Sequence, residues 1–513
     1  MKKILLVFPC QKEELAEDLQ LELEDAFSDN GAALVNVSKN IKHAKANITG
    51  HKFDLVIINI NIPEDTKTPI DESAQLGIHL AEWMQNNNLP QNIVVIAPSY
   101  SNETSIHINK IENCLLLTET ATLIEDVINH AISAKPPEKF VELIFDLSED
   151  NHRWKYQIGL VPRQMDPDCG HITVSQSFVE DLTDLSSDMS NPTSSNWEQK
   201  LSRVGTKLRN ELFHINGEFG IKLINQLNNV GGLEHSRVKF IVGKDMHPIM
   251  LEAIIPPTLN MLETIAPTTP SKYWMLQAPL YRRIRVEGCD QCTIFQGEQR
   301  TPINCLVIRS NIDGPVEEFN KDSLPLKLEK LDNVPHECDT LVSFLQNKKK
   351  EFNIGEICEL GKDDKNPATF ENVKNTLNSK PWHLIHYAGH SFYDDESDLG
   401  YLFFPDDAGL GLPQKVAIPD FAGYAMNTQF IYLSSCHSTD VQFAFSLASN
   451  QIPGVLGYRW DIDDELAMNH AASFYKHLFE ERSVERAFLK TRQDMHMEHQ
   501  DARIWAAPML ILQ

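Results

Sequence analysis

The first 135 residues alternate short apolar runs with stretches whose apolar positions recur at helical spacing. The apolar runs predict strands at residues 4–8, 53–60, 93–97 and 114–117, and the helical spacing predicts helices at 11–27, 77–85 and 123–132. Such alternation over this length is typical of a small doubly wound α/β sheet of about five strands. This part of the chain is therefore expected to be a compact α/β domain.

A second region of alternation begins at residue 304. Its predicted strands are 305–309, 354–360, 382–388, 429–433 and 454–459, and its predicted helices are 335–345, 368–377, 441–448 and 465–480. The stretch between the two regions predicts strands at 139–147, 155–161 and 237–242, helices within 197–227, and a serine-rich loop at 186–196. Two prolines mark a linker at 134–139. We therefore expect three parts, at residues 1–135, 140–300 and 301–513.

A reactive side chain follows each of two neighbouring apolar runs in the last part. His390 comes after the run 382–388, and Cys436 comes after the run 429–433. Neighbouring parallel strands end at the same edge of a sheet, so the thiol and the imidazole are expected to meet there. A thiol beside an imidazole is a nucleophile with its base, whereas the alternative is a buried cysteine and a structural histidine.

Small residues around these positions indicate sharp turns at the strand ends. Cys436 is preceded by two serines, and His390 is preceded by Gly389. Turns of this kind direct backbone N–H groups into the crevice, as an oxyanion hole requires. The candidate donors are the amides of Cys436, Gly389 and Ser391.

Histidine and cysteine spacing also admits metal sites. His383, His386 and His390 would share one face of a helix, but the surrounding Trp, Ile and Tyr favour a strand, on which His383 and His386 face opposite ways. We therefore interpret His386 as a structural histidine that hydrogen-bonds beneath the site. Cys289 and Cys292 lack the second ligand pair that zinc needs, so a reduced surface turn is favoured. We expect neither a metal nor a cofactor.

The net charge and the lack of a long apolar run argue against nucleic acid and membrane as direct partners. The formal net charge of −26 over 513 residues would repel nucleic-acid phosphates and anionic lipid, and no basic run offsets it. No apolar run approaches the roughly 20 residues that cross a bilayer. We therefore expect a cytoplasmic protein that binds neither nucleic acid nor membrane directly.

The run 53–63 resembles the third strand of response-regulator receiver domains. Asn59 stands where that family carries its phosphate-accepting aspartate, and residues 9–12 lack the family's acidic magnesium pair. Ala97 and Thr118 stand at or near the family's hydroxyl and lysine positions. The resemblance implies a flavodoxin-like pseudo-receiver without phosphotransfer. Its expected role is to dock an activating partner, and the alternative is a domain that only packs against the rest.

The segments His386-Tyr-Ala-Gly-His390 and Ser434-Ser-Cys-His-Ser438 resemble the paired signatures of caspase-fold cysteine peptidases, above all of the CHAT family. Further similar segments are 335–345, 454–464, 473–475, 484–487 and 505–510, and 237–252 with 273–283 resembles a degenerate first half. The resemblance implies a caspase-like doubly wound sheet over about residues 140–513. It also implies that Cys436 is the nucleophile and His390 the catalytic histidine, without an obligatory third member.

Two departures from related patterns bear on the site. The family usually has glycine where Ser391 stands, and a Cβ constrains that turn, so the resting site is expected to await an activator. Metacaspases that cleave after Arg or Lys carry an acidic residue at the position of Ser434, but Trp460, Asp461 and Asp464 are similar to the strand that lines the separase pocket. We hypothesise a basic primary residue, with acidic and apolar residues as alternatives.

The predicted function is that of an intracellular cysteine endopeptidase, a hydrolase that cleaves a specific partner protein. By resemblance, bacterial members act in antiviral defence or regulated death and cut a co-encoded effector such as a gasdermin-like protein. The alternative is a catalytically vestigial caspase-fold scaffold that binds partners.

Overall fold

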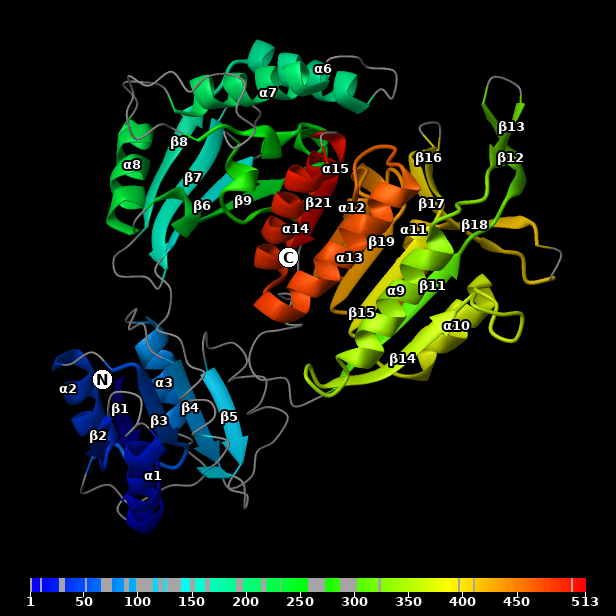
Figure 1. Cartoon of the computed structure of the whole chain (residues 1–513). Helices are drawn as coiled ribbons and strands as arrows, with labels where there is room; N and C mark the ends of the chain where they lie inside the picture. The colour runs from blue at the N-terminus through cyan, green and yellow to red at the C-terminus, as the bar shows by residue number, and fades with distance from the viewer. Residues whose placement is uncertain are drawn as a thin grey trace. The chain divides into compact units, whose positions relative to one another are not determined.

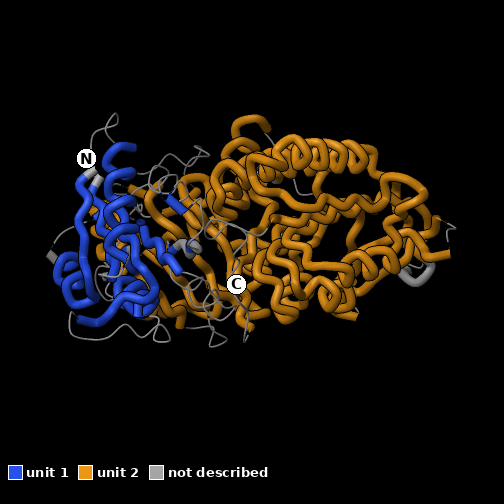
Figure 2. The backbone as a smooth tube through the Cα atoms, turned by 90° about the horizontal axis from the view of Figure 1, so that it is seen from below, with its two compact units in different colours: residues 1–140, 159–167, 296–298 blue, residues 141–158, 168–295, 299–513 orange. Residues whose placement is uncertain are grey.

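The computed structural model describes residues 2–9, 12–26, 33–50, 53–65, 76–86, 92–97, 114–118, 123–124, 127, 140–147, 153–161, 167–190, 197–213, 218–230, 232–256, 273–286, 302–321, 324–394, 397–408, 411–499 and 502–513. The chain divides into two compact units (Figure 2). Unit 1 comprises residues 1–140, 159–167 and 296–298, and unit 2 comprises residues 141–158, 168–295 and 299–513. The division near residue 140 lies just after Pro136 and Pro137, which interrupt the alternation of apolar and polar residues.

Within the described residues, unit 1 is built around a five-stranded parallel sheet in the order β2-β1-β3-β4-β5 (Figure 1). The strands are β1 (Lys2–Val7), β2 (Ala33–Ser38), β3 (Leu55–Asn59), β4 (Asn92–Ala97) and β5 (Cys114–Thr118). This strand order is that of flavodoxin-like folds. The predicted doubly wound sheet is confirmed.

Alternate residues of β1 and its neighbour β3 face opposite layers. Leu5 and Val7 of β1 join an apolar cluster with α2 (Ile41–Gly50) and α3 (Leu76–Asn86). The neighbouring Ile4 and Leu6 join a second cluster with α1 (Glu13–Ala26). Burial on both faces explains the nearly continuous apolar runs of these strands.

The hydrophobic pattern did not predict strand β2 or helix α2. Strand β2 is an edge strand that carries Asn36 and Ser38 among its apolar residues, so its run is too short to stand out. Helix α2 mixes polar and apolar residues with a terminal glycine. The predicted linker at 134–139 lies outside the described residues, as does most of the predicted helix at 123–132.

In the described part of unit 2, one eleven-stranded mixed sheet runs in the order β14-β11-β15-β19-β20-β21-β10-β9-β6-β7-β8. Its C-terminal portion is β11 (Ile303–Ser310), β14 (Ile354–Leu360), β15 (Leu384–Gly389), β19 (Phe430–Ser434), β20 (Gly454–Tyr458) and β21 (Pro508–Leu512). The remainder is β6 (Phe140–Leu147), β7 (Arg153–Val161), β8 (Asp168–Thr173), β9 (Ser236–Val242) and β10 (Leu280–Ile284). We call residues 141–286 the first half and residues 302–513 the second half of unit 2.

Helices cover both faces of the second half. The chain passes from β11 to β14 in one direction along the sheet and then from β14 through β15 and β19 to β20 in the other. Because connections between parallel strands are right-handed, the two directions place their helices on opposite faces. One face carries α9 (Val334–Asn347), and the other carries α10 (Phe370–Ser379), α11 (Ile418–Ala425) and α12 (Val441–Ser449). Helix α13 (Asp464–Glu481) packs between α9 and α14 (Val484–Glu498) on the first face (Figure 1). The predicted caspase-like arrangement of a parallel sheet between helical layers agrees with this architecture.

The two halves share the sheet through β21 and β10. Strand β21 runs antiparallel to β20 and parallel to β10, so the last strand of the chain joins both halves. Short helix α15 (Ala502–Ala506) precedes β21 and contacts α7 (Trp197–Leu212) of the first half. The predicted boundary at residue 300 therefore falls inside one continuous sheet, and it stays a prediction.

Several elements of unit 2 were not predicted. Strands β16 (Ser391–Asp394), β17 (Leu399–Pro405) and β18 (Pro413–Ala417) form a small antiparallel sheet, and β12 (Gly314–Lys321) pairs with β13 (Leu324–Leu328). The expected loop at 186–196 is wrong for its first five residues, which lie in α6 (Gln176–Ser190). Phe178, Val179 and Leu182 bury one face of that helix, and this helical spacing outweighs the serine content that suggested a loop.

The strand ends of unit 1 generate a prediction about phosphotransfer. Asn59, Ala97 and Thr118 are the last residues of β3, β4 and β5. An amide cannot form an acyl phosphate, so acetyl phosphate with Mg²⁺ should leave unit 1 unmodified by intact mass spectrometry. Asn59→Asp alone should also stay unmodified because the magnesium-binding acidic pair is missing. An active receiver domain serves as the control, and a stable phosphoryl group on the wild-type chain would contradict the pseudo-receiver.

Candidate active site

The register of two adjacent strands brings Cys436 and His390 to one place. Strands β15 and β19 pair in parallel, and the last paired residues are Ala388 and Ser434. His390 and Cys436 each follow two residues later, just beyond the last paired residues. Both side chains line one pocket at this sheet edge.

The pocket combines apolar walls with a few polar groups. Its apolar lining comes from Leu331, Val334, Ile462 and Ala467, and its polar lining includes Glu337, Ser435 and Tyr458. A concave apolar site with few convergent polar groups is the usual form of a substrate pocket.

The imidazole of His390 is oriented by a backbone carbonyl. Its Nε2 lies 2.7 Å from the carbonyl oxygen of Glu329. A carbonyl oxygen can only accept, so Nε2 carries the hydrogen and Nδ1 is left with a lone pair. Burial lowers the pKa of His390, although the Glu329 contact opposes this effect. The ring is therefore neutral at pH 7, and Nδ1 is able to take a proton.

The backbone of His390 is also fixed. Its carbonyl oxygen accepts hydrogen bonds from the Tyr387 hydroxyl at 2.7 Å and from the Phe403 amide at 3.2 Å. A Cβ on Gly389 would lie 2.6 Å from the Ser310 carbonyl oxygen, so only glycine permits this close approach. The turn that presents His390 thus depends on packing against the small antiparallel sheet and β11.

The thiol of Cys436 is neutral in this structure. Burial raises its pKa to about 12, and the amide of Ile462, 3.5 Å from Sγ, offsets this only in part. The Ile462 carbonyl oxygen lies 3.8 Å from Sγ and accepts the weak thiol hydrogen bond. A neutral thiol beside a neutral imidazole requires proton transfer during attack, because no preformed thiolate is present.

The loop that carries Cys436 folds back tightly against β20. His437 has φ of 54°, in the left-handed region. The Ser438 hydroxyl accepts a hydrogen bond from the Tyr458 amide at 3.0 Å and lies 2.7 Å from the Ser435 carbonyl oxygen. A Cβ on Gly457 would lie 2.4 Å from Ser438 Oγ, so glycine at 457 allows the loop to approach the strand.

His437, the residue after Cys436, bridges two carboxylates. Its Nδ1 lies 3.3 Å from Asp440 Oδ2, and its Nε2 lies 3.3 Å from Asp461 Oδ1. Burial would lower the pKa of His437, but the two carboxylates outweigh it and raise the pKa to about 10. His437 is therefore a cation at neutral pH and neutralises part of the charge of Asp461.

Ser391 connects the two catalytic loops. Its hydroxyl donates a hydrogen bond to the carbonyl oxygen of Cys436. A glycine, which is usual at this position in the resembling family, would lack this bond. The backbone amides of Gly389, Ser391 and Cys436 belong to residues that line the pocket, and their role as oxyanion donors stays a prediction.

The predicted substrate-pocket residues are divided in space. Ser434 and Asp464 line the pocket. Asp464 accepts two hydrogen bonds of 2.9 Å from Asn333, which hold its pKa below the usual value although burial opposes them. The side chain of Asp461 is 60% exposed at His437, and Trp460 is buried against Trp197.

The three histidines of the His390 segment have separate partners. His383 Nδ1 accepts a hydrogen bond from the Asn304 amide, whereas buried His386 lies 3.1 Å from the Tyr475 hydroxyl and 3.0 Å from Glu337 Oε1. His386 is thus hydrogen-bonded beneath the pocket, as expected. Across the described ranges, no three His, Cys, Asp or Glu side chains are arranged to hold a metal ion. Cys289 and Cys292 lie outside those ranges.

Comparison with known families identifies the second half of unit 2 together with β10. The family model for the CHAT domain matches residues 279–513. Residues 279–513 form a CHAT domain. CHAT domains belong to the caspase-like clan and are typically cysteine peptidases, which is the class that the Cys436 and His390 motifs resemble. No curated protein matches the chain.

Solved structures similar to the chain include receiver domains. They include the receiver domain of Francisella response regulator 1452 (18% identity, TM-score 0.20, 26% of this chain and 94% of that chain). A CheY-like receiver domain from Methanospirillum hungatei has 16% identity and a TM-score of 0.21 over 26% of this chain and 91% of its own. A signal receiver domain from Colwellia psychrerythraea has 15% identity and a TM-score of 0.21 over 26% and 98%. Among the helices that the structure describes, none is long and apolar enough to cross a membrane.

Sequence reasoning missed the backbone groups around Cys436 and His390. The Glu329 carbonyl and the Ile462 amide act through the main chain, so no residue type marks them. The pair of His437 with Asp440 could have been found, because the two residues are three apart in a tight turn.

The charge on His437 generates a pH prediction. Its folded-state pKa is raised from 6.5 to about 10, so its stabilisation is fully present below pH 6.5 and is lost as the pH rises toward 10. The wild type should therefore lose about 1 kcal/mol of unfolding free energy relative to His437→Gln between pH 6 and pH 10, a modest amount because the pairs are partly exposed. Urea denaturation at several pH values measures the difference. In an Asp440→Asn/Asp461→Asn background the pH trend should vanish, and a trend that persists there would reject this origin.

Proposed function

We propose that the chain is a cysteine endopeptidase in which Cys436 is the nucleophile and His390 is the general base. The observation that carries the proposal is the shared position of the two side chains. Both follow adjacent parallel strands and line one pocket. The Nε2–H of the His390 imidazole is held by the Glu329 carbonyl. The CHAT domain that contains both residues supports the same class of chemistry.

The mechanism follows from the neutral state of the pair. When Cys436 Sγ attacks the scissile carbonyl carbon, Nδ1 of His390 takes the thiol proton. The Glu329 carbonyl stabilises the imidazolium that forms. Backbone amides of Gly389, Ser391 and Cys436 hold the oxyanion. The imidazolium then gives its proton to the leaving amine, and water activated by His390 hydrolyses the thioester to release the acid and restore the thiol.

The proposed enzyme rests in a poorly reactive state. A thiol with a pKa of about 12 and a hydroxyl of Ser391 tied to the Cys436 carbonyl both favour an inactive arrangement. Activation then requires a change in the loops at 389–391 and 436–439. The receiver-like unit 1 is the proposed docking site for an activating partner, since such domains commonly engage other proteins.

The proposed substrate is a specific protein in a bacterial defence or regulated-death system. A co-encoded effector such as a gasdermin-like protein, cut in the cytoplasm, suits an enzyme that is kept inactive until a signal arrives. The hypothesis of a basic primary residue rests on Asp464 in the pocket and Asp461 at its rim. Arg459 does not oppose it, because its guanidinium is buried against Glu252.

A vestigial scaffold is the second candidate function. The raised pKa of the Cys436 thiol is the observation that favours it, because a thiol of this kind is unreactive at neutral pH. In that case the two units would act by binding partners alone.

An activity-based probe distinguishes the two candidates. A pool of peptidyl acyloxymethyl ketones, incubated with the chain and its co-encoded proteins, should label wild type at Cys436 and should not label Cys436→Ala. His390→Ala should lower the labelling rate at least about 100-fold, because it removes the base. Cys169→Ala, which removes an exposed thiol away from the pocket, is the matched control and should behave as wild type. Equal labelling of wild type and Cys436→Ala, without cleavage of any co-encoded protein, would favour the scaffold.

A peptide library tests the primary specificity. Wild type should cleave after Arg or Lys, and Asp464→Asn should raise KM for such peptides about tenfold because a charged hydrogen bond is lost. Asp461→Asn should have a smaller effect, since His437 already neutralises that carboxylate. Asp420→Asn changes an exposed carboxylate on α11 and serves as the control. Cleavage after acidic or apolar residues with none after Arg or Lys would reject the hypothesis.

A further inference from the structure

A cluster of charged side chains is buried where the first half of unit 2 meets the CHAT second half. Glu252 lies in a short 3-10 turn, Leu251–Ala253, and Arg282 lies in β10. Arg459 follows β20, and Arg492 lies in α14. Their exposed fractions are 2%, 0%, 8% and 1%, so all four are removed from solvent.

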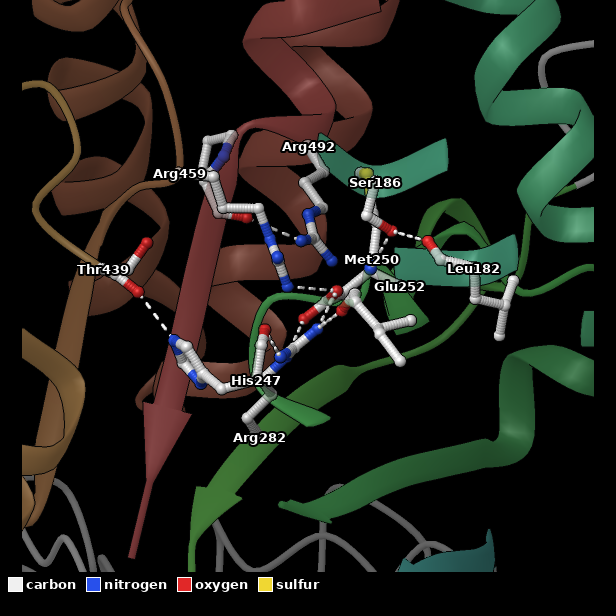
Figure 3. A network of polar contacts seen from close by, with 11 residues as sticks. Leu182, Ser186, His247, Met250, Glu252, Arg282, Thr439, Arg459 and Arg492 are labelled. Carbon is white, nitrogen blue, oxygen red and sulfur yellow. Dashed lines mark hydrogen bonds and ion pairs between the residues drawn. The ribbon is translucent and has the colours of Figure 1, made fainter. Parts of the chain in front are cut away.

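Glu252 is the acceptor that joins the two halves in this cluster. Its Oε1 lies 2.6 Å from Arg282 Nε, and its Oε2 lies 2.8 Å from Arg282 Nη2 and 2.7 Å from Arg459 Nη2. Figure 3 shows the carboxylate between the two guanidinium groups. Burial would raise the pKa of Glu252, but the two arginines hold it well below its usual value. The carboxylate is therefore charged, and Arg459 relies on it for compensation.

A second link connects the same segment to the nucleophile loop. His247, which is 2% exposed, places Nε2 2.7 Å from the carbonyl oxygen of Thr439. Burial lowers the pKa of His247 to about 3, so the ring is neutral, and Nε2 must donate because a carbonyl only accepts. The Thr439 amide in turn donates to the Tyr458 carbonyl at 3.2 Å.

The segment 247–252 is itself held firmly in the first half. Arg282 donates from Nη1 to the His247 carbonyl at 2.5 Å. The Met250 amide donates to Ser186 Oγ at 2.9 Å, and that hydroxyl donates to the Leu182 carbonyl at 2.7 Å. The segment is therefore bound to β10 and α6 by its own backbone groups.

The two links end on the two stretches of chain that lead to the Cys436 thiol. Thr439 closes the loop that begins at Cys436. Arg459 begins the stretch that reaches Ile462, whose amide lies 3.5 Å from Cys436 Sγ. We propose that His247 and Glu252 are positioning residues, through which the first half sets the placement of residues 436–439 and 459–462 around the Cys436 thiol. This inference rests on the proposed peptidase function.

The arrangement has a consequence for activation. Because one rigid segment holds both stretches, a shift of the first half displaces both stretches together. A change in the first half can thus move the thiol relative to the Ile462 amide without any contact with the substrate.

Hydrogen exchange and kinetics on the full chain test the proposal. Glu252→Gln and His247→Leu should each speed amide exchange at least tenfold within residues 436–439 and 459–462, while β11 and β14 keep wild-type rates. On the best peptide from the library, kcat should fall about 100-fold with little change in KM, since misplacement of reacting groups acts on the chemical step. His247→Gln, which keeps a donor, should restore most of kcat.

The matched control is Glu485→Gln. It breaks the 2.9 Å ion pair between Arg237 of β9 and Glu485 of α14, which also joins the two halves but away from the pocket. This control should retain wild-type kcat and wild-type exchange at 436–439 and 459–462. Glu252→Gln and Arg459→Met should be non-additive in kcat, because they remove the same contact.

Several outcomes would overturn the positioning role. Unchanged exchange in both stretches would do so, as would an equal change in Glu485→Gln or a kcat for His247→Leu equal to that of the control. If Glu252→Gln fails to fold, His247→Leu and Arg459→Met decide the matter. A wild-type chain that cleaves no peptide would sink the peptidase proposal, whereas the exchange rates would still show whether the segment 247–252 anchors the two stretches.

Discussion

The parallel pairing of β15 with β19 is the constraint on which the candidate site depends. His390 and Cys436, 46 positions apart, line one pocket because Ala388 pairs with Ser434 and both strands end at the same sheet edge. A register shift of one residue would turn His390 or Cys436 to the other face of the sheet. The buried apolar side chains on both faces of these strands prevent such a shift, so the core specifies the chemistry at its edge.

Burial determines the chemical state of that site. Desolvation keeps both the Cys436 thiol and the His390 imidazole uncharged, so the pair has no preformed ion pair to attract reagents or substrates. In the proposed mechanism, a charge appears only when a substrate carbonyl is attacked, where the Glu329 carbonyl and nearby amides stabilise it. The hydrogen bond from the Ser391 hydroxyl to the Cys436 carbonyl links the loop at 389–391 to the loop at 436–439, so a movement of one loop relative to the other would break it. The same arrangement of Cys436, His390 and Ser391 thus explains a thiol that is unreactive at rest and is consistent with an activity that a signal switches on.

The first half of unit 2 contributes to the site without supplying a catalytic side chain. It extends the CHAT sheet through β10 and β21, and it places a buried carboxylate and a neutral histidine against the two stretches that flank Cys436. A degenerate half that is retained in this way has a physical reason to persist, because Arg459 and the Thr439 carbonyl would otherwise be buried without these partners. The same half offers a route by which a distant event could alter the pocket.

The amino-acid sequence by itself determined the strand and helix pattern of both α/β regions, the two motifs that carry Cys436 and His390, and the structural place of His386. These features depend on local periodicity and residue type, which a single chain displays directly. The tertiary structure alone decided the edge strand β2, the Glu329 carbonyl behind His390 and the Glu252 contact with Arg459. Each of these depends on backbone groups or on partners up to 207 residues apart, and no local pattern encodes which distant group will fill a buried position.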